Sequence, residues 1–542
     1  MLVIVSGLLI WTSLPKIQRL VTTGNVSPDL TEQYEELPFA GSRHARSCLC
    51  PRTPTGQRLC STYPPAAIKR SQLVSSTNAR MKTVLAKFMR ERESGSMRRL
   101  KVGIMGGSVS ACHGVAEDGD SMGKECYARI VGDWLDERLG GGEAGWGKMV
   151  EVKNGAIGGM DASYYAFCGM NHLHDDVDIV ILEFDVNDQA NREYAVYFDQ
   201  LVRIVLSWSS SPAVIILGTW GPLIAHDLGS LTPMWAHLPV AHYYDIPYLS
   251  IHPMLWPTFL RFPHSVAETF FHPDGFHPTA EGQRLLADIV VAHLESVFCE
   301  MDRDAWDEKH GLSEWTKEET WVGGGSLTVN SASTFKSLVA EKNFPALIPG
   351  EPSLSATAYE FLSLPNTTSV QPIALPHPLD TILDVSEPDP ESWEDFYSAK
   401  SKVPRPFCAD ANSKVQPFKP KHNTGWKTMV WKNEKHFWVS DTVGAEISVD
   451  IKVNEGRVAV FYFRSEKLSP GTADCWVDDN EKGAKRLQGH WPHHQNVPSV
   501  SYIDAEVTPG NHLYVQAVLS RPIPVEAGSH RYCLGCRPPE LS

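Results

Sequence analysis

Five residues, spread over four short blocks of the chain, have the types and the order that acyl transfer requires. They are Ser108, Gly159, Asn187, Asp274 and His277. A serine hydroxyl is a poor nucleophile until a base removes its proton, and histidine is the side chain best suited to that task near neutral pH. Asp274 precedes His277 by three residues and can hold the second ring nitrogen. The blocks therefore predict a serine nucleophile with a histidine base and an orienting carboxylate.

The same blocks supply donors for the negative charge that develops on the substrate oxygen. We expect this oxyanion hole to consist of the backbone N–H groups of Ser108 and Gly159 and the side-chain amide of Asn187. Two alternatives stay open, since Ser110 is a rival nucleophile and Gly158 a rival for Gly159. This chemistry requires neither a cofactor nor a metal ion, and we predict none.

Elements that would hold these residues alternate between strand and helix over residues 76–300. Helical spacing of apolar residues is found over 127–139, 197–208 and 281–298. Short apolar runs predict strands, and the alternation indicates a parallel sheet covered by helices on both faces. Ligands of such sheets bind at the carboxyl ends of the strands, where the blocks lie. The predicted strands are Leu100–Met105, Met149–Lys153, Val177–Phe184, Ala213–Gly218 and Pro247–Ile251.

On these blocks the chain resembles the SGNH (GDSL-like) hydrolases over roughly residues 76–300. The resemblance implies a flavodoxin-like three-layer sandwich, with Ser108 as nucleophile, Gly159 and Asn187 in the oxyanion hole, and Asp274 and His277 completing the triad. The sequences around Ser108 and Asn187 also resemble those of a narrower set, the fungal capsule-associated proteins. Two positions depart from the family pattern. Gly107 stands where an aspartate is usual, and Asp185 where a glycine is usual.

The N-terminal region differs from the catalytic segment. Residues 1–20 begin with an apolar stretch that predicts a short signal-anchor or a cleaved signal peptide, and 21–75 predict a polar stem. With 11 cysteines and two glycosylation sequons, at Asn25 and Asn366, the chain is typical of the secretory pathway, the Golgi lumen or the cell surface. We expect disulfides with at least one cysteine unpaired, and favour them over a zinc site because no second ligand pair has zinc spacing.

Beyond residue 300 the pattern changes twice. Residues 301–420 are irregular and partly rich in proline and acidic residues, which predicts a linker region. From 421 to 542 short β segments separated by turns predict a β-sandwich domain. Five strands are predicted there, over 445–453, 457–464, 473–478, 499–507 and 512–519.

Composition and motifs together leave two classes of function. The net charge of −15 excludes a nucleic-acid partner, whose phosphates need a basic surface. The first hypothesis is a serine esterase that removes or transfers acyl groups, above all O-acetyl groups, on carbohydrate. The second is a non-catalytic carbohydrate-binding or scaffold protein of polysaccharide (capsule) biosynthesis. In both, the partner is an acylated carbohydrate or polysaccharide, with a membrane contact through the N-terminal anchor, and no oligomeric state is predicted.

Overall fold

A computed structural model describes most of the chain between residues 48 and 519. The described ranges are 48–115, 122–141, 147–230, 232–309, 406–431, 435–454, 456–466, 468, 470–491, 497–504 and 507–519, with the backbone of 321–322 and 326–327. The N-terminal signal or anchor (1–20), residues 21–47 of the stem, both sequons and Cys533 and Cys536 lie outside these ranges, as does most of 301–420. Among the described residues, no helix is long and apolar enough to cross a membrane.

Ser108, Gly159 and Asn187 lie on loops that follow strands of a six-stranded sheet. Its strands lie in the order β1-β6-β5-β4-β2-β3, and all except the edge strand β1 run parallel. Counted along the chain, the parallel strands lie 2-1-3-4-5, the flavodoxin-like order. The predicted fold class is therefore confirmed. The strands are β1 (Gln72–Val74), β2 (Leu100–Gly106), β3 (Val150–Asn154), β4 (Ile179–Glu183), β5 (Ala213–Gly218) and β6 (Tyr248–Ser250).

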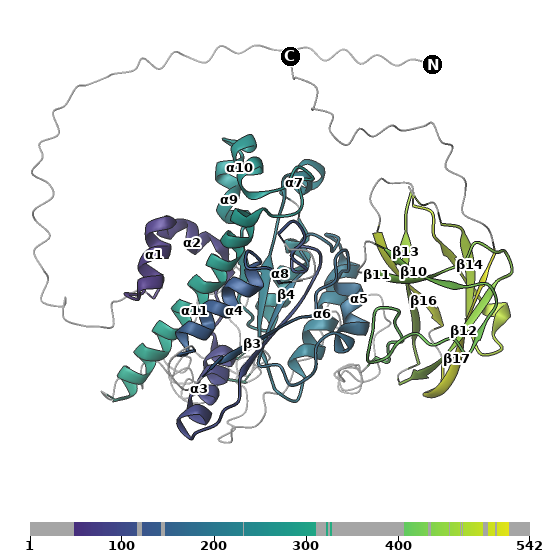
Figure 1. Ribbon diagram of the computed structural model, residues 1–542, viewed down its shortest axis with the longest axis horizontal. Coiled ribbons are helices and arrows are strands. Elements are labelled where there is room, and N and C mark those ends of the chain that lie inside the picture. Colours follow the sequence, from purple (N-terminus) through teal and green to yellow (C-terminus); the bar gives the residue numbers. More distant parts are fainter. Residues whose placement is uncertain are drawn as a thin grey trace, which may run out of the picture. The chain divides into compact units, whose positions relative to one another are not determined.

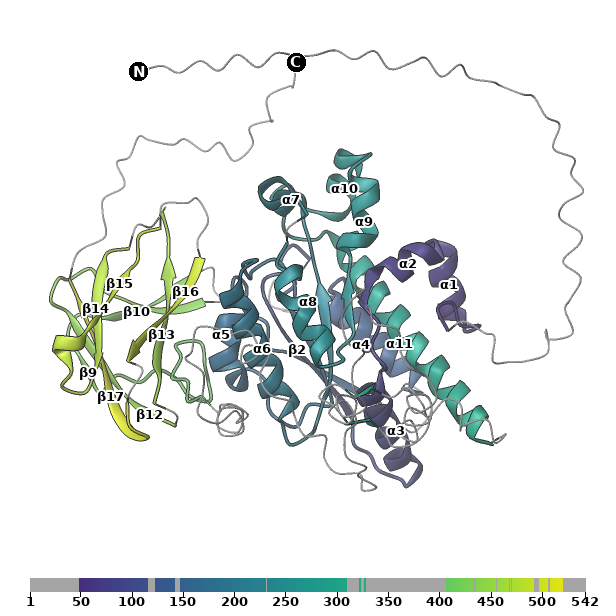
Figure 2. The ribbon, with the colours of Figure 1, turned by 180° about the vertical axis from the view of Figure 1, so that it is seen from behind.

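Helices cover both faces of this sheet (Figures 1 and 2). One hydrophobic core joins the sheet to α3 (Ala79–Glu93), α4 (Tyr127–Arg138) and α11 (Ala280–Lys309). A second core joins the opposite face to α5 (Ala162–Cys168), α6 (Arg192–Leu206) and α8 (Met234–Tyr243). All five residues of β4 are buried, which explains why its sequence is continuously apolar. Further helices are α7 (Pro222–Leu228), α9 (His252–Phe259) and α10 (Pro263–Phe270), and Gly169–Asn171 forms a short 3₁₀ helix.

Side-chain caps fix where the helices of the second face begin. Asp161 accepts a hydrogen bond from the Tyr164 N–H and starts α5, and Asn191 accepts one from Tyr194 and starts α6. Such caps satisfy N–H groups that have no partner within the helix. Helix α5 begins at Ala162, three residues after Gly159.

The α/β domain begins earlier than the sequence indicated. Residues 21–75 were expected to form a stem, yet α1 (Pro54–Thr62), α2 (Pro65–Ser71) and β1 pack into the domain. β1 pairs with β6, and a disulfide joins Cys48 to Cys299 of α11. The boundary at residue 75 is therefore wrong for 48–75. These elements are short and two of the helices begin with proline, so they lack the long periodic pattern that predicts a helix.

Most cysteines of the described ranges are paired. The disulfides are Cys48–Cys299, Cys50–Cys60, Cys112–Cys126 and Cys168–Cys408. Cys475 is a buried free thiol, and burial raises its pKa to about 12. The prediction of disulfides with an unpaired cysteine agrees with this arrangement, and pairing removes Cys48, Cys50 and Cys60 from the zinc alternative.

A second domain, called the β-domain here, follows with strands β9–β17. Its five-stranded antiparallel sheet has the order β15-β14-β17-β12-β9, and two further pairs are β10–β11 and β13–β16. The predicted strands are present, whereas β9–β11 and β15 were not predicted. The strands are β9 (His422–Asn423), β10 (Lys427–Trp431), β11 (Lys435–Val439), β12 (Glu446–Val453), β13 (Val458–Arg464), β14 (Thr472–Val477), β15 (Lys485–Gln488), β16 (Val497–Asp504) and β17 (Gly510–Val518), with a 3₁₀ helix over Glu481–Gly483. Two short strands, β7 (Trp321–Val322) and β8 (Ser326–Leu327), pair outside this domain.

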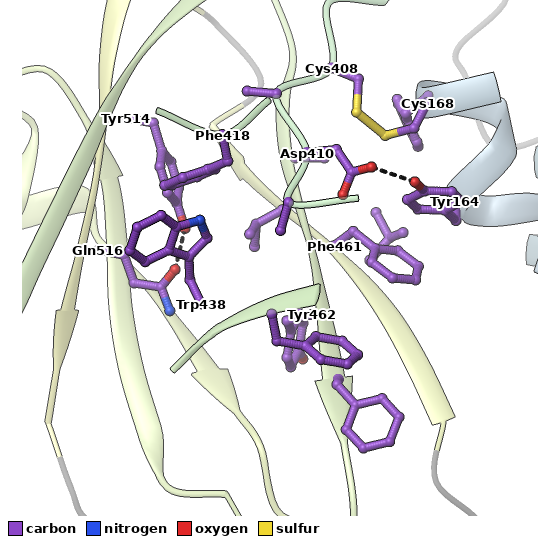
Figure 3. Close-up of a pocket in the computed structure, with 18 of the residues that line it drawn as sticks. Tyr164, Cys168, Cys408, Asp410, Phe418, Trp438, Phe461, Tyr462, Tyr514 and Gln516 are labelled. Atoms are coloured by element: carbon purple, nitrogen blue, oxygen red, sulfur yellow. Dashed lines mark hydrogen bonds between the residues drawn. A yellow bond between two sulfur atoms is a disulfide. The ribbon is translucent and has the colours of Figure 1, made fainter. Parts of the chain in front are cut away.

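Direct contacts join α5 to the β-domain (Figure 3). The disulfide Cys168–Cys408 links them covalently, and Tyr164 donates a hydrogen bond of 2.6 Å to Asp410. The Phe461 ring of β13 lies 5.0 Å from the Tyr164 ring. Residues 406–420 were expected to belong to the linker region, but these contacts show that their first part is packed structure. A cavity of about 1090 Å³ extends from α5 into the β-domain and is lined largely by apolar and aromatic side chains.

Candidate active site

The nucleophile turn follows β2 and depends on two glycines. A Cβ atom on Gly107 would lie 1.8 Å from Asn187 Oδ1, and one on Gly106 would lie 2.6 Å from Ser110 Oγ. Only glycine therefore lets the Asn187 side chain pack against the turn that carries Ser108. An aspartate at position 107 would collide with the Asn187 side chain as it is placed here.

Ser108, His277 and Asp274 form a continuous hydrogen-bonded chain. Ser108 Oγ lies 2.9 Å from His277 Nε2, and His277 Nδ1 lies 2.6 Å from Asp274 Oδ2. The other carboxylate oxygen of Asp274 accepts the N–H groups of residues 276 and 277, at 2.9 and 3.0 Å. With Nδ1 donating to the carboxylate, Nε2 is free to accept the serine proton. The structure thus brings together three predicted residues that are up to 169 positions apart.

Electrostatics favour an ionised Asp274. Burial alone raises the pKa of this carboxyl, but hydrogen bonds from His277 and from the backbone outweigh burial. The net result is a pKa below the ordinary value for aspartate. A carboxylate that stays ionised can hold the imidazole in one tautomer and stabilise the imidazolium that forms when His277 takes a proton.

The predicted oxyanion donors sit on loops that follow neighbouring strands. Gly159 follows β3, Ser108 follows β2 and Asn187 follows β4, and these three strands are adjacent in the sheet. Asn187 Oδ1 is buried and has no hydrogen-bond partner among the described residues. The three residues therefore converge at one edge of the sheet, where they can surround the oxygen of a bound ester.

Gly158 and Gly159 differ in their surroundings. Gly159 has φ of +75°, a conformation that glycine adopts at little cost. Gly158 is buried, and a Cβ atom there would lie 2.5 Å from the ring of His113. That ring also lies 5.6 Å from the His277 ring, so His113 covers Gly158 at the rim of the site. Gly159 is consequently the better placed of the two to meet a substrate.

Ser110, the rival nucleophile, points beneath the site. It is fully buried, and its hydroxyl lies 2.9 Å from Glu183 Oε2 and 2.8 Å from the Tyr127 hydroxyl. Burial raises the pKa of Glu183 to about 8, although hydrogen bonds from Thr219 and Ser110 lower it. Ser110 thus belongs to a buried polar network that supports the nucleophile turn, and its hydroxyl has no imidazole partner there.

A second buried network contains Asp185, the other position at which the sequence departs from the family pattern. The His237 side chain is fully buried, with Nδ1 at 2.8 Å from Asp185 and Nε2 at 2.7 Å from Asp188. Tyr248 also donates to Asp185. A Cβ atom on Gly218 would lie 2.5 Å from the Asp185 carboxylate, so the glycine at 218 makes room for it.

This network connects the two oxyanion loops. Asp188, next to Asn187, also accepts the N–H of Ala162 at 2.8 Å, at the start of the helix that follows Gly159. Burial lowers the pKa of His237, but hydrogen bonds and charges from the two aspartates outweigh it and raise the pKa to about 9. Sequence reasoning missed His237, because it lies 49 residues from Asp188 and no local pattern marks it.

No family model and no curated protein matches the chain. Among solved structures, a two-domain esterase (CEX) active on acetylated mannans is similar, with 16% identity over 84% of this chain and 94% of that chain and a TM-score of 0.49. Axe2, an acetylxylan esterase from Geobacillus stearothermophilus, is similar with 15% identity over 36% of this chain and 94% of that chain, with a TM-score of 0.28. A putative lipolytic protein of the G-D-S-L family from Desulfitobacterium hafniense DCB-2 is similar with 12% identity over 35% and 98%, with a TM-score of 0.24.

Proposed function

We propose that this protein is a serine esterase that cleaves acyl esters, above all O-acetyl groups on carbohydrate. The observation that carries the proposal is the hydrogen-bonded chain from Asp274 through His277 to Ser108. This chain joins the loop after β2 to the loop between α10 and α11, which lie far apart in the sequence. Its geometry is that of a nucleophile, a general base and an orienting group.

The reaction follows from these positions. Ser108 Oγ attacks the ester carbonyl carbon while His277 Nε2 takes its proton, and the carbonyl oxygen becomes negatively charged. The N–H groups of Ser108 and Gly159 and the amide of Asn187 donate hydrogen bonds to that oxygen. His277 then gives its proton to the departing alcohol, leaving an acyl group on Ser108. Water, activated by His277, releases the acid and restores the serine.

Two features support a small acyl group and an oxidising location. Ser108 is only 8% exposed, which favours a small group such as acetyl next to the nucleophile. The four disulfides among the described residues support action in the secretory pathway or at the cell surface. The narrower link to capsule polysaccharide stays a prediction from the sequence. Transfer of the acyl group to a sugar hydroxyl would use the same site if that hydroxyl replaced water.

The test is acetyl release from p-nitrophenyl acetate and from acetylated mannan and acetylated xylan, the polymers on which two of the similar enzymes act. Ser108→Ala should abolish release, while Ser110→Ala, its matched control, should retain most of it. Wild-type protein that releases no acetyl and does not react with a serine-directed phosphonate would contradict the esterase. If the wild-type protein is inactive in this way but binds glycan, and Ser108→Ala leaves that binding unchanged, the non-catalytic alternative is favoured.

A further inference from the structure

One cationic side chain of the β-domain reaches the catalytic edge of the α/β domain. Lys435 is the first residue of β11, and its Nζ lies 2.9 Å from the position that a Cβ atom on Gly159 would occupy. Gly159 has no side chain, so the ammonium group lies next to its backbone. The residue that would donate an N–H to the oxyanion therefore has a positive charge beside it.

A chain of hydrogen bonds fixes Lys435 relative to that backbone. Tyr164 of α5 donates to one oxygen of Asp410, as Figure 3 shows, and Asn412 donates from its N–H and Nδ2 to the other, at 3.1 and 3.2 Å. Asn412 in turn accepts the N–H of His436 at 2.8 Å and donates to its carbonyl at 3.3 Å. His436 follows Lys435 directly. The path runs from α5, which starts just after Gly159, to the residue next to the lysine.

Aromatic packing holds the hairpin that carries Lys435. In the β10–β11 ladder Lys435 lies opposite Trp431. The rings of Trp431 and Phe437 lie 5.5 and 5.7 Å from the ring of Phe463 in β13. The disulfide Cys168–Cys408 ties the same region covalently to α5. The backbone of Lys435 is therefore held near Gly159 by packing, hydrogen bonds and a covalent link.

We infer that Lys435 completes the oxyanion side of the active site. An ammonium group a few ångströms from the developing oxyanion favours the charged transition state over the neutral ester. The net charge of the chain is −15. The Lys435 ammonium group nevertheless places a positive charge where the negative charge of the oxyanion forms. The inference rests on the proposed esterase activity and adds to it that the active site is built from both domains.

The experiment compares two Lys435 variants of the full-length protein with p-nitrophenyl acetate as substrate. Lys435→Met removes the charge and keeps the length of the side chain, so kcat should fall about tenfold with KM changed less than about twofold. Lys435→Arg keeps the charge and should retain most of the activity. Higher salt should narrow the difference between wild type and Lys435→Met, because ions screen the charge.

Lys427→Met is the matched control. Lys427 lies in β10, the partner strand, where it pairs with Asp441 at 3.5 Å on the exposed surface. We expect wild-type kinetics for this variant. Wild-type kcat in Lys435→Met, equal losses in Lys435→Met and Lys435→Arg, or a change in KM alone would overturn the inference while leaving the esterase intact. Inactive wild-type protein would overturn both.

Discussion

The layer beneath the nucleophile turn and the interior of the β-domain are built in opposite ways. Beneath the turn, buried polar groups such as Glu183 and His237 have hydrogen-bond partners on both sides. The β-domain, together with α5 and α6, lines a cavity of about 1090 Å³, and most of strand β13 is only half-buried. Satisfied polar networks hold a single geometry, whereas an incompletely filled apolar interior tolerates rearrangement.

The difference separates two tasks. The α/β domain fixes the reacting groups, which catalysis requires to within fractions of an ångström. The β-domain contributes Lys435 at the edge of the site and otherwise leaves its aromatic interior open. Changes in the first region should therefore affect the chemical step strongly, and changes in the second should affect stability and substrate approach.

Among changes that leave Ser108 in place, Asp274→Asn in the α/β domain should reduce activity the most. Asparagine can still accept the backbone N–H groups of residues 276 and 277, so the loop should keep its shape. It cannot hold His277 in the required tautomer or stabilise the imidazolium, so kcat should fall by about 10³–10⁴. Steady-state kinetics with p-nitrophenyl acetate measure this, and a thermal melt checks the fold. A loss below tenfold would show that Asp274 does not orient the base.

Asn187→Ala tests the oxyanion side of the same region. Removing one oxyanion donor costs about 10²–10³ in kcat, with a smaller change in KM. Asn187 Oδ1 has no partner among the described residues, so its removal deprives none of them of a hydrogen bond. The free energy of unfolding, measured in urea, should accordingly change little. If stability falls while kcat is retained, Asn187 supports the turn instead of the transition state.

The segments with Ser108 and Asn187 could be predicted from the sequence, because each follows a strand with a strong apolar pattern, and β2, β4 and β5 lie within two residues of their predicted ranges. Asp274 and His277 lie between α10 and α11, and they were singled out by their spacing and by the family resemblance. His237 and Lys435 could not be found. Each acts through contacts between segments far apart in the chain, and neither stands in a pattern that distinguishes it from other histidines or lysines.

The short N-terminal elements show a different reason for failure. Helices α1 and α2 have nine and seven residues, too few for a periodic apolar pattern to stand out. Their place in the fold is fixed by contacts with α11, including Cys48–Cys299 and a hydrogen bond from Tyr63 to Asp288. Only tertiary structure distinguishes such a segment from a stem.

A double variant, Cys168→Ser with Cys408→Ser, removes the disulfide that ties α5 to the β-domain. The disulfide closes a loop of 240 residues, and loss of a disulfide costs about 2–4 kcal/mol in the free energy of unfolding. Activity on p-nitrophenyl acetate should fall no further than in Lys435→Met, because the triad lies wholly in the α/β domain. Cys50→Ser with Cys60→Ser is the control, since that disulfide spans only 10 residues and leaves the contact intact. A loss beyond 100-fold in the first variant would mean that the β-domain supports the triad itself.

The buried networks predict that stability falls as the pH rises. Glu183 has a pKa of about 8 in the folded chain against an ordinary value of 4.5, and His237 about 9 against 6.5. Between the ordinary and the folded values, each group binds a proton in the folded state that the unfolded state has lost. As the pH rises, the free energy of unfolding therefore falls by up to about 1.4 kcal/mol per pH unit for each of these groups.

Glu183→Gln separates the two contributions. Glutamine keeps the shape of a protonated glutamate and does not titrate, so the fall in stability between pH 6 and 8 should become shallower. The contribution of His237 should remain and persist until about pH 9. Urea denaturation at pH 6, 7, 8 and 9 measures both curves. Wild-type stability that stays constant or rises between pH 6.5 and 8 would mean that these groups lose their protons as readily in the folded chain as in the unfolded one. Glu183 would then be ionised beneath the nucleophile, and His237 would be neutral.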